Sequence, residues 1–416
     1  MTRIRPLRTT AALAALLATS ALPAFASGPV PVGPAFRLTP CQTCRQHGPA
    51  VAGAPSGTFL VAFDMKNTTT GPVVQQRFFK TSGLPAAPPA IAQAPGGPPQ
   101  YDAAVGSNAL GAFVVAWSAV NGSTSNSDIL AHRFDATGKA LGTDIQVSVD
   151  GPGLRALDTM PVVALSSDGG FTVAWLRLIP PGQAVPAAGT QVWARRFTAA
   201  GLALGPAIQL SSGLVEGKRP GLCVDTLKRA VVTWTTVDAV HIFEPNLNGV
   251  ALRRVNINGG ALGAVVAVAR PTSNTAQSAI SCGPAGTFVV AWETNQAPAA
   301  SGDDILVQRF ATTGKKNGPA VVVNTETVQD QRFPAITTDA GGNFVVVWKD
   351  LNVDHYGIYG QRFSAAAAKV GAEFNATNKL YSEERPSVAA AGAANAFVVA
   401  WEDVTGVLGR RFKVVP

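Results

Sequence analysis

Cysteine and histidine are the first residues in this sequence whose spacing could support chemistry. The segment "CQTCRQH", Cys41 to His47, has a C-x-x-C pair. Covalent haem attachment requires histidine at the fifth position, where this sequence has Arg45, and a redox dithiol requires a strand-to-helix context, of which there is no sign. The four histidines show no zinc-binding spacing: His47, His132, His241 and His355. We therefore predict a structural disulfide between Cys41 and Cys44, as expected in an oxidising compartment.

Carboxylates form a second candidate site, in loops of the C-terminal half. The residues in question are Asp303, Asp304, Asp350, Asp354 and Asp403, with Glu293 and Glu402 nearby. A hard cation such as calcium binds six to eight oxygens, which these loops could supply. No loop shows the D-x-D-x-D-G spacing of a dedicated calcium site, so solvated carboxylates or pairs with arginine are the alternative. No other cofactor is indicated.

No catalytic residue can be assigned from motifs. The segment "SSDGGFTVAW", Ser166 to Trp175, is similar to the Asp-box hairpin of sialidases except for Val173 in the final place. Other copies of this hairpin in the chain do not keep the pattern, which favours coincidence. There is no nucleophile elbow, phosphate loop or Rossmann glycine pattern.

The elements that must position these residues form a tandem repeat. "LGAFVVAWSA", "AGTFVVAWET", "GGNFVVVWKD" and "ANAFVVAWED" are variants of one apolar strand. Its final aromatic residue recurs every 53 to 59 residues, and an arginine follows each copy. The aromatic positions are Phe63, Trp117, Trp175, Trp234, Trp292, Trp348 and Trp401, and the arginines are Arg77, Arg133, Arg196, Arg254, Arg309, Arg362 and Arg411.

Each repeat contains four short strands. One precedes the aromatic strand, as in "PAITT" at Pro334, and one follows the arginine strand, as in "LGPAIQL" at Leu204. The aromatic strand is apolar on both faces, which is typical of a sheet packed between two other sheets. Seven such units predict an all-β fold, a seven-bladed β-propeller of four-stranded blades.

The two ends of the repeat array complement each other. The last copy stops at "GRRFKVVP" without a fourth strand, whereas "VGPAFRL", Val32 to Leu38, resembles a fourth strand and precedes the first copy. We predict that this N-terminal strand completes the C-terminal blade and closes the ring, which would cover two exposed sheet edges.

The repeat also gives bland roles to its strongest residues. Aromatic residues between blades are expected to be buried rather than to stack on sugars. Each arginine is expected to pack along a neighbouring blade, with its head meeting a carboxylate. Cys223 and Cys282 lie in the first strands of neighbouring repeats, one position out of step relative to Trp234 and Trp292. Their side chains should therefore point toward each other, and we predict a disulfide between them.

The N-terminus predicts export. Arg3, Arg5 and Arg8 precede an apolar run that ends in Ala24-Phe25-Ala26, which is the pattern of a secretory signal peptide over residues 1–26. The formal net charge is +8, and removing these three arginines leaves about +5, without a basic cluster. We predict one propeller domain over 27–416, secreted to the periplasm or medium, monomeric, without a membrane span and without affinity for nucleic acid.

One copy carries a resemblance to a known group of proteins. "DAGGNFVVVWKDLNVDHYGIYGQRFSAAAAKVGAEFNAT", Asp339 to Thr377, follows the linker "NTETVQDQRFP". These segments resemble the repeats of exported bacterial tandem-repeat propellers, in which G-G-F-V-V-V-W, G-I-Y-G-Q-R-F, G-x-E-F-x-V-N and D-Q-x-x-P follow in order. The resemblance implies a propeller fold and export, and a role as a surface or secreted module.

Length variation indicates where a ligand could bind. From the aromatic to the arginine the spacing ranges from 10 to 21 residues, whereas from the arginine to the next aromatic it is 38 to 42. Variable loops on a rigid scaffold commonly carry binding residues. We predict a non-catalytic module that binds a glycan, protein or cell-envelope partner. The alternatives are a hydrolase or lyase with carboxylates at the channel mouth, and a purely structural module.

Overall fold

The computed structural model describes residues 28–38, 45–67, 71–91, 98–121, 126–149, 156–181, 189–211, 218–237, 248–273, 275–294, 302–352, 356–377, 384–392 and 396–414. The predicted signal peptide, Cys41, Cys44 and Asp354 lie outside these residues. Within them the protein is all-β, as predicted, and helix is confined to the single 3-10 turn η1 (Pro284–Gly286). No helix of the described part is long and apolar enough to cross a membrane.

The strands follow the predicted four-strand order. The first strands are β3 (Arg45–Gly53), β7 (Gln100–Ser107), β11 (Leu157–Leu165), β15 (Gly221–Val224), β19 (Thr275–Cys282), β23 (Gln331–Thr338) and β27 (Glu384–Ala390). The second strands are β4 (Phe59–Asn67), β8 (Phe113–Val120), β12 (Phe171–Ile179), β16 (Ala230–Val237), β20 (Phe288–Thr294), β24 (Phe344–Asp350) and β28 (Ala396–Asp403). The third strands are β5 (Gly71–Phe79), β9 (Ser127–Phe134), β13 (Gly189–Phe197), β17 (Asn248–Val255), β21 (Asp304–Phe310), β25 (Gly357–Phe363) and β29 (Gly406–Val414). The outer strands are β6 (Ala90–Ile91), β10 (Ala140–Gln146), β14 (Ile208–Gln209), β18 (Ala261–Ser273), β22 (Val321–Val322) and β26 (Lys369–Asn375).

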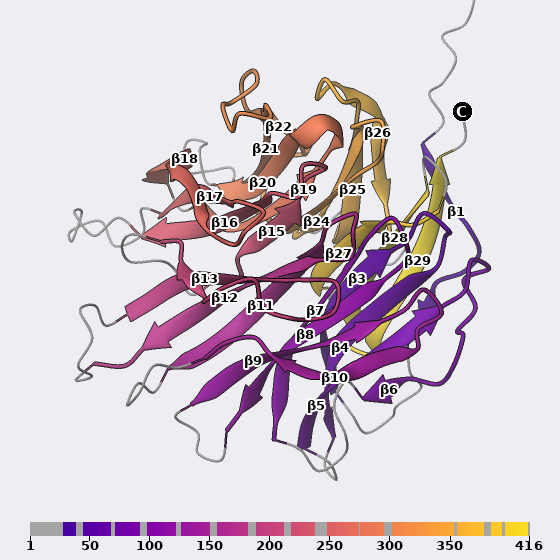
Figure 1. Ribbon diagram of the computed structural model, residues 1–416. Helices are drawn as coiled ribbons and strands as arrows, with labels where there is room; N and C mark the ends of the chain where they lie inside the picture. The colour runs from indigo at the N-terminus through magenta and orange to yellow at the C-terminus, as the bar shows by residue number, and fades with distance from the viewer. Residues whose placement is uncertain are drawn as a thin grey trace, which may run out of the picture.

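Antiparallel hydrogen bonds join these strands into sheets that radiate from a centre, as in a β-propeller (Figure 1). Four of the sheets have four strands each, and a single parallel bridge between Leu157 and Ser127 joins two more such units into one eight-stranded sheet. The first strands lie innermost. Each contacts the next along the chain, and β27 contacts β3, so that the yellow C-terminal strands lie beside the indigo N-terminal ones (Figure 1).

The N-terminal segment pairs with the last sheet. Strand β1 (Pro29–Pro31) runs antiparallel to the end of β29, with Pro29 opposite Val414. Strand β2 (Phe36–Arg37) continues along β29, with Phe36 opposite Gly409. The pairing predicted from "VGPAFRL" is therefore observed, and it covers the edge that β29 would otherwise leave open.

The repeated aromatic residues fill the spaces between sheets. All six tryptophans of the column, and Phe63, are at most 2% exposed. Phe63 packs against Ala389, Val398 and Ala400 of the C-terminal sheet, so the last and first sheets share an apolar cluster of the same kind as other neighbours. Burying one such ring contributes up to roughly 4 to 6 kcal/mol. These rings cannot present a face to a ligand.

The repeated arginines link neighbouring sheets through main-chain oxygens. Arg254 Nη1 donates to the carbonyl of Thr312 at 3.1 Å, and Arg309 Nη1 donates to the carbonyl of Ala365 at 2.9 Å. Arg133 makes the same bond to Ala199. The expectation that these heads meet carboxylates is wrong, because the hairpin after the next third strand presents a carbonyl at this place. Their structural role is as expected.

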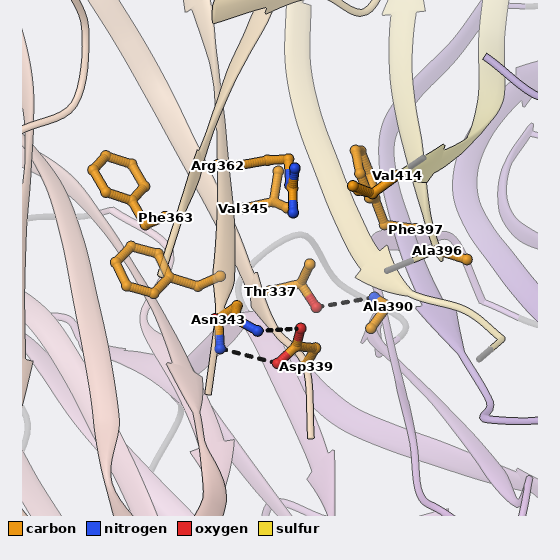
Figure 2. A pocket seen from close by; sticks show the side chains of 11 residues that line it. Thr337, Asp339, Asn343, Val345, Arg362, Phe363, Ala390, Ala396, Phe397 and Val414 are labelled. Carbon is orange, nitrogen blue, oxygen red and sulfur yellow. Dashed lines mark hydrogen bonds between the residues drawn. The ribbon is translucent and has the colours of Figure 1, made fainter. Parts of the chain in front are cut away.

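A crevice between the last two sheets shows how closely the blades pack (Figure 2). Its volume is about 30 Å³, enough for a water molecule. Thr337 Oγ1 accepts the Ala390 N–H at 2.9 Å across it, and Asp339 caps its own hairpin by accepting the Asn343 N–H at 2.9 Å. The aromatic rings of Phe363 and Phe397 fill much of the remaining space (Figure 2).

A disulfide joins Cys223 of β15 to Cys282 of β19, with a Cα–Cα distance of 5.5 Å. The prediction from the out-of-step spacing of these residues is confirmed. The bond ties two neighbouring inner strands across 59 residues of sequence.

We predict that deleting residues 28–38 from the mature chain lowers the Tm by several degrees and promotes aggregation, because the edge of β29 becomes exposed. Calorimetry and light scattering measure both effects. A chain trimmed only through residue 27 is the control, and equal melting of the two chains would contradict the prediction.

We predict that replacing Cys223 and Cys282 together by serine lowers the free energy of unfolding by about 3 to 5 kcal/mol, because the bond restricts the unfolded chain. Denaturant titration checks this. Reduction of the unaltered protein should produce the same loss, and a midpoint insensitive to both treatments would argue against it.

Candidate functional site

The inner strands share an irregularity near their beginning. The register with the second strand shifts between His47 and Ala50 in β3, and at the equivalent place in β7, β11, β19, β23 and β27. Each shift is a β-bulge, which re-aims side chains and is common next to functional sites. Because the inner strands start on the face where the loops between second and third strands emerge, the bulges lie on that face.

Left-handed backbone occurs at these bulges. The residues are Gly48, Asp102, Met160, Phe333 and Arg385, with φ between 47° and 61°, and we call them the bulge residues. Proline follows all of them except Asp102. Proline removes a ladder donor and disfavours right-handed helical backbone in the residue before it, which explains why the chain turns here.

The bulges surround a central cavity of about 560 Å³. Every inner strand, or the residues just before it, contributes to its lining. The four bulge residues with side chains all line it: Asp102, Met160, Phe333 and Arg385. A cavity of 300 to 1,000 Å³ is typical of small-molecule sites. This cavity is the candidate functional site.

The charged lining is mainly cationic. Lys218, Arg219 and Arg385 line the cavity, against Asp102 as its one carboxylate among the described lining residues. Arg219 Nη1 donates to the carbonyls of Ala103 at 3.0 Å and Pro161 at 3.3 Å, and Arg219 Nη2 lies 3.7 Å from Asp102 Oδ1. Arg219 therefore ties three inner segments together.

Asp102 is engaged on both carboxylate oxygens. Its Oδ2 accepts the Ser118 hydroxyl at 3.0 Å and the Met160 N–H at 3.0 Å, while Arg219 lies near Oδ1. Lys218 and Arg385, by contrast, have no polar partner within the described part of the chain. The cavity thus carries two unpaired cations.

Carboxylates from the preceding sheet hold the bulges in place. Asp64 Oδ2 accepts the Asp102 N–H at 2.9 Å, Glu293 Oε2 accepts the Phe333 N–H at 2.7 Å, and Glu402 Oε2 accepts the Gly48 N–H at 2.9 Å. With Asp102, which holds Met160, we call these the bulge-anchoring carboxylates. Asp64, Glu293 and Glu402 each directly follow the repeated aromatic residue. Successive residues face opposite sides of a strand, so the aromatic packs toward one sheet and the carboxylate reaches the other.

Two of these carboxyls have altered acidity. Burial raises the pKa of Glu293 to about 7 and that of Asp64 to about 6, although each accepts two main-chain N–H groups that favour the charged form. Glu293 is 5% exposed, so the loss of hydration outweighs those bonds. Both groups are anchored to backbone and neither lines the cavity.

The residues predicted to bind calcium are not gathered around one point. Asp304 Oδ1 accepts the Asn324 amide at 2.7 Å, Asp350 Oδ1 accepts the Asn352 N–H at 2.9 Å, and Asp403 Oδ1 caps Thr405. Asp303 Oδ2 lies 3.3 Å from Arg332 Nη2. Across the described ranges, no three His, Cys, Asp or Glu side chains are grouped so that they could hold a metal. With Asp354 outside these ranges, the calcium hypothesis stays a prediction.

Sequence reasoning placed the binding residues in the variable loops, parts of which lie outside the described residues. It missed the bulge residues. The available signal was the residue before the repeated proline, which varies as Gly48, Met160, Phe333 and Arg385 while the strand after it keeps its pattern.

Comparison with known proteins supports the fold. No family model matches the chain, and no curated protein matches its sequence significantly. Among solved structures, a Dyadobacter fermentans protein of unknown function has a TM-score of 0.53 at 10% identity, covering 90% of this chain and 100% of its own. An α-L-arabinofuranosidase from Fusarium graminearum has a TM-score of 0.51 at 9% identity, covering 76% of this chain and 93% of its own. At such identities the likeness concerns the fold alone.

We predict that Glu293 makes the protein less stable as pH rises. Its pKa is raised above the unfolded value of 4.5, so the folded state binds the proton more tightly. Stability is then fully present below pH 4.5 and falls as pH rises through about 7, by roughly 3 kcal/mol at most. Chemical denaturation from about pH 5 to 8 measures the slope.

Glu293→Gln should flatten that slope, even if losing a well-placed acceptor lowers stability by a constant amount. Glu326→Gln, at an exposed position, is the matched control and should keep the slope of the unaltered protein. Equal slopes in all three proteins would show that Glu293 does not titrate in this range.

Proposed function

We propose that this protein is a secreted, non-catalytic binding module: a seven-bladed propeller whose ligand, a glycan or a protein segment, enters the central cavity at the bulge residues. The observation that carries the proposal is the cavity of about 560 Å³, lined by side chains on rigid inner strands. Rigid elements hold recognition groups more accurately than loops do.

Closure of the ring, with seven blades over 27–416, is supported by equivalent contacts at inner and terminal interfaces. Gln100 Oε1 accepts the Val74 N–H at 3.0 Å between the first two sheets. Gln46 Oε1 accepts the Val407 N–H at 3.0 Å between the first and last sheets. The Glu402–Gly48 bond at 2.9 Å likewise repeats the Asp64–Asp102 bond at 2.9 Å.

Binding rather than catalysis is favoured by the state of the carboxylates. The bulge-anchoring carboxylates are occupied by main-chain N–H groups, and general acid–base catalysis requires such a group within reach of the substrate. Secretion is supported by the disulfide, since such bonds persist in oxidising compartments. A glycan ligand accords with the arabinofuranosidase among proteins of similar fold. Membership of the exported tandem-repeat group remains part of this proposal.

A hydrolase or lyase is the second candidate. The observation that favours it is the pKa of Glu293, raised to about 7, together with that of Asp64, raised to about 6, because catalytic acids and bases commonly have such values.

We predict saturable binding of at least one ligand class, without turnover. A glycan array and a panel of envelope polysaccharides, each followed by product analysis, test both parts. Steady product release that Glu293→Gln or Asp64→Asn abolishes, in a protein that still folds, would establish the enzyme instead. Absence of binding across glycans and envelope extracts would count against a binding role.

A further inference from the structure

The bulge residues raise a question that structure alone does not require. A left-handed conformation costs an L-residue roughly 1 to 2 kcal/mol and costs glycine nothing. Gly48 occupies this place in β3, so the fold accepts glycine there. Asp102, Met160, Phe333 and Arg385 nonetheless carry side chains at equivalent places, with φ of 61°, 52°, 55° and 47°. Strained backbone that persists beside a cavity points to a use for the side chain.

The chemistry of these side chains is specific. Arg385 is exposed, lines the cavity, and finds no polar partner within the described residues. Lys218 lines the same cavity under the same condition. Asp102, the lining carboxylate, is already bound by Ser118, Met160 N–H and Arg219. The cavity therefore offers unpaired positive charge and no comparable free negative charge.

An aromatic face adjoins one of these cations. Phe333 begins β23 and Arg385 begins β27, and these inner strands contact each other. Both side chains line the cavity. The Glu293 carboxyl fixes the Phe333 backbone through a bond of 2.7 Å to its N–H, so the ring is presented from an anchored bulge. A ring with apolar C–H faces could stack on Phe333 while an attached anion reaches Arg385.

From these observations we infer that the cavity binds an acidic sugar, a uronate residue of a polysaccharide, with its carboxylate at Arg385 and Lys218 and its ring against Phe333. This inference rests on the proposed binding function and names the ligand class. A cavity of about 560 Å³ has room for one or two sugar residues.

The test uses digalacturonate and its methyl ester, titrated calorimetrically into the mature protein. The ester keeps the rings and removes the charge. We expect the acid to bind at least tenfold more tightly than the ester, since a hydrogen-bonded charge pair contributes that much. The affinity should fall between about 20 mM and about 200 mM NaCl, since salt screens a cavity open to solvent.

Arg385→Gly separates binding from folding. Glycine relieves the left-handed strain, so the Tm should stay equal or rise, whereas affinity for digalacturonate should fall at least tenfold. Phe333→Gly should also weaken binding, and Lys218→Ala should weaken it several-fold. Lys315→Ala, an exposed cation of the hairpin after β21 on the opposite face, is the matched control and should bind as the unaltered protein does.

Three outcomes would overturn the inference. Equal binding of acid and ester would leave the proposed binding function intact and remove the charge requirement. Full affinity in Arg385→Gly would place the ligand elsewhere. Displacement of digalacturonate by inorganic phosphate at equal concentration, with no effect of Phe333→Gly, would indicate a general anion site. If no uronate binds, the neutral glycans of the array decide separately whether the binding function survives.

Discussion

The fold depends on second strands that are apolar on both faces. In β8, β20 and β24 every described residue but the last of β8 is buried. A strand of this kind is stable only with a sheet on each side, so no unit of the repeat can bury its own surface alone. The first and last sheets face the same requirement, and the cluster of Phe63 with Ala389 and Val398 meets it. Pairing of β1 and β2 with β29 then covers the remaining edge.

Polar contacts set the geometry at the centre of this apolar frame. The carboxylate that follows the repeated aromatic residue reaches the next inner strand and accepts an N–H at the bulge, as Asp64, Glu293 and Glu402 do. These bonds stabilise a left-handed conformation that would otherwise be unfavourable. As a result, the side chains of the bulge residues line one cavity, held by backbone rather than by flexible loops. The same residues that align the sheets also position the candidate ligand groups.

Several particular predictions show how far pattern reasoning reaches. The Cys223–Cys282 bond follows from alternation along two strands, which is a local rule, and it is confirmed. The arginine heads were expected at carboxylates, yet Arg254 and Arg309 meet carbonyls, because the neighbouring hairpin, not the side-chain inventory, decides which acceptor lies there. Glu293 was grouped with loop carboxylates and is instead buried against the next sheet. Its altered acidity arises from that burial.

The sequence by itself determined the all-β class, the four-strand unit, the burial of the aromatic column and the N-terminal strand that pairs with β29. All of these depend on periodicity and on which side chains avoid water, and both can be read along the chain. Only the tertiary structure decided the bulges, their left-handed residues and the convergence of Phe333, Arg385 and Lys218 on one cavity. These residues lie far apart in sequence and share no motif. They meet because the packing of successive sheets places the start of every inner strand around a common axis, and no local pattern encodes that rotation.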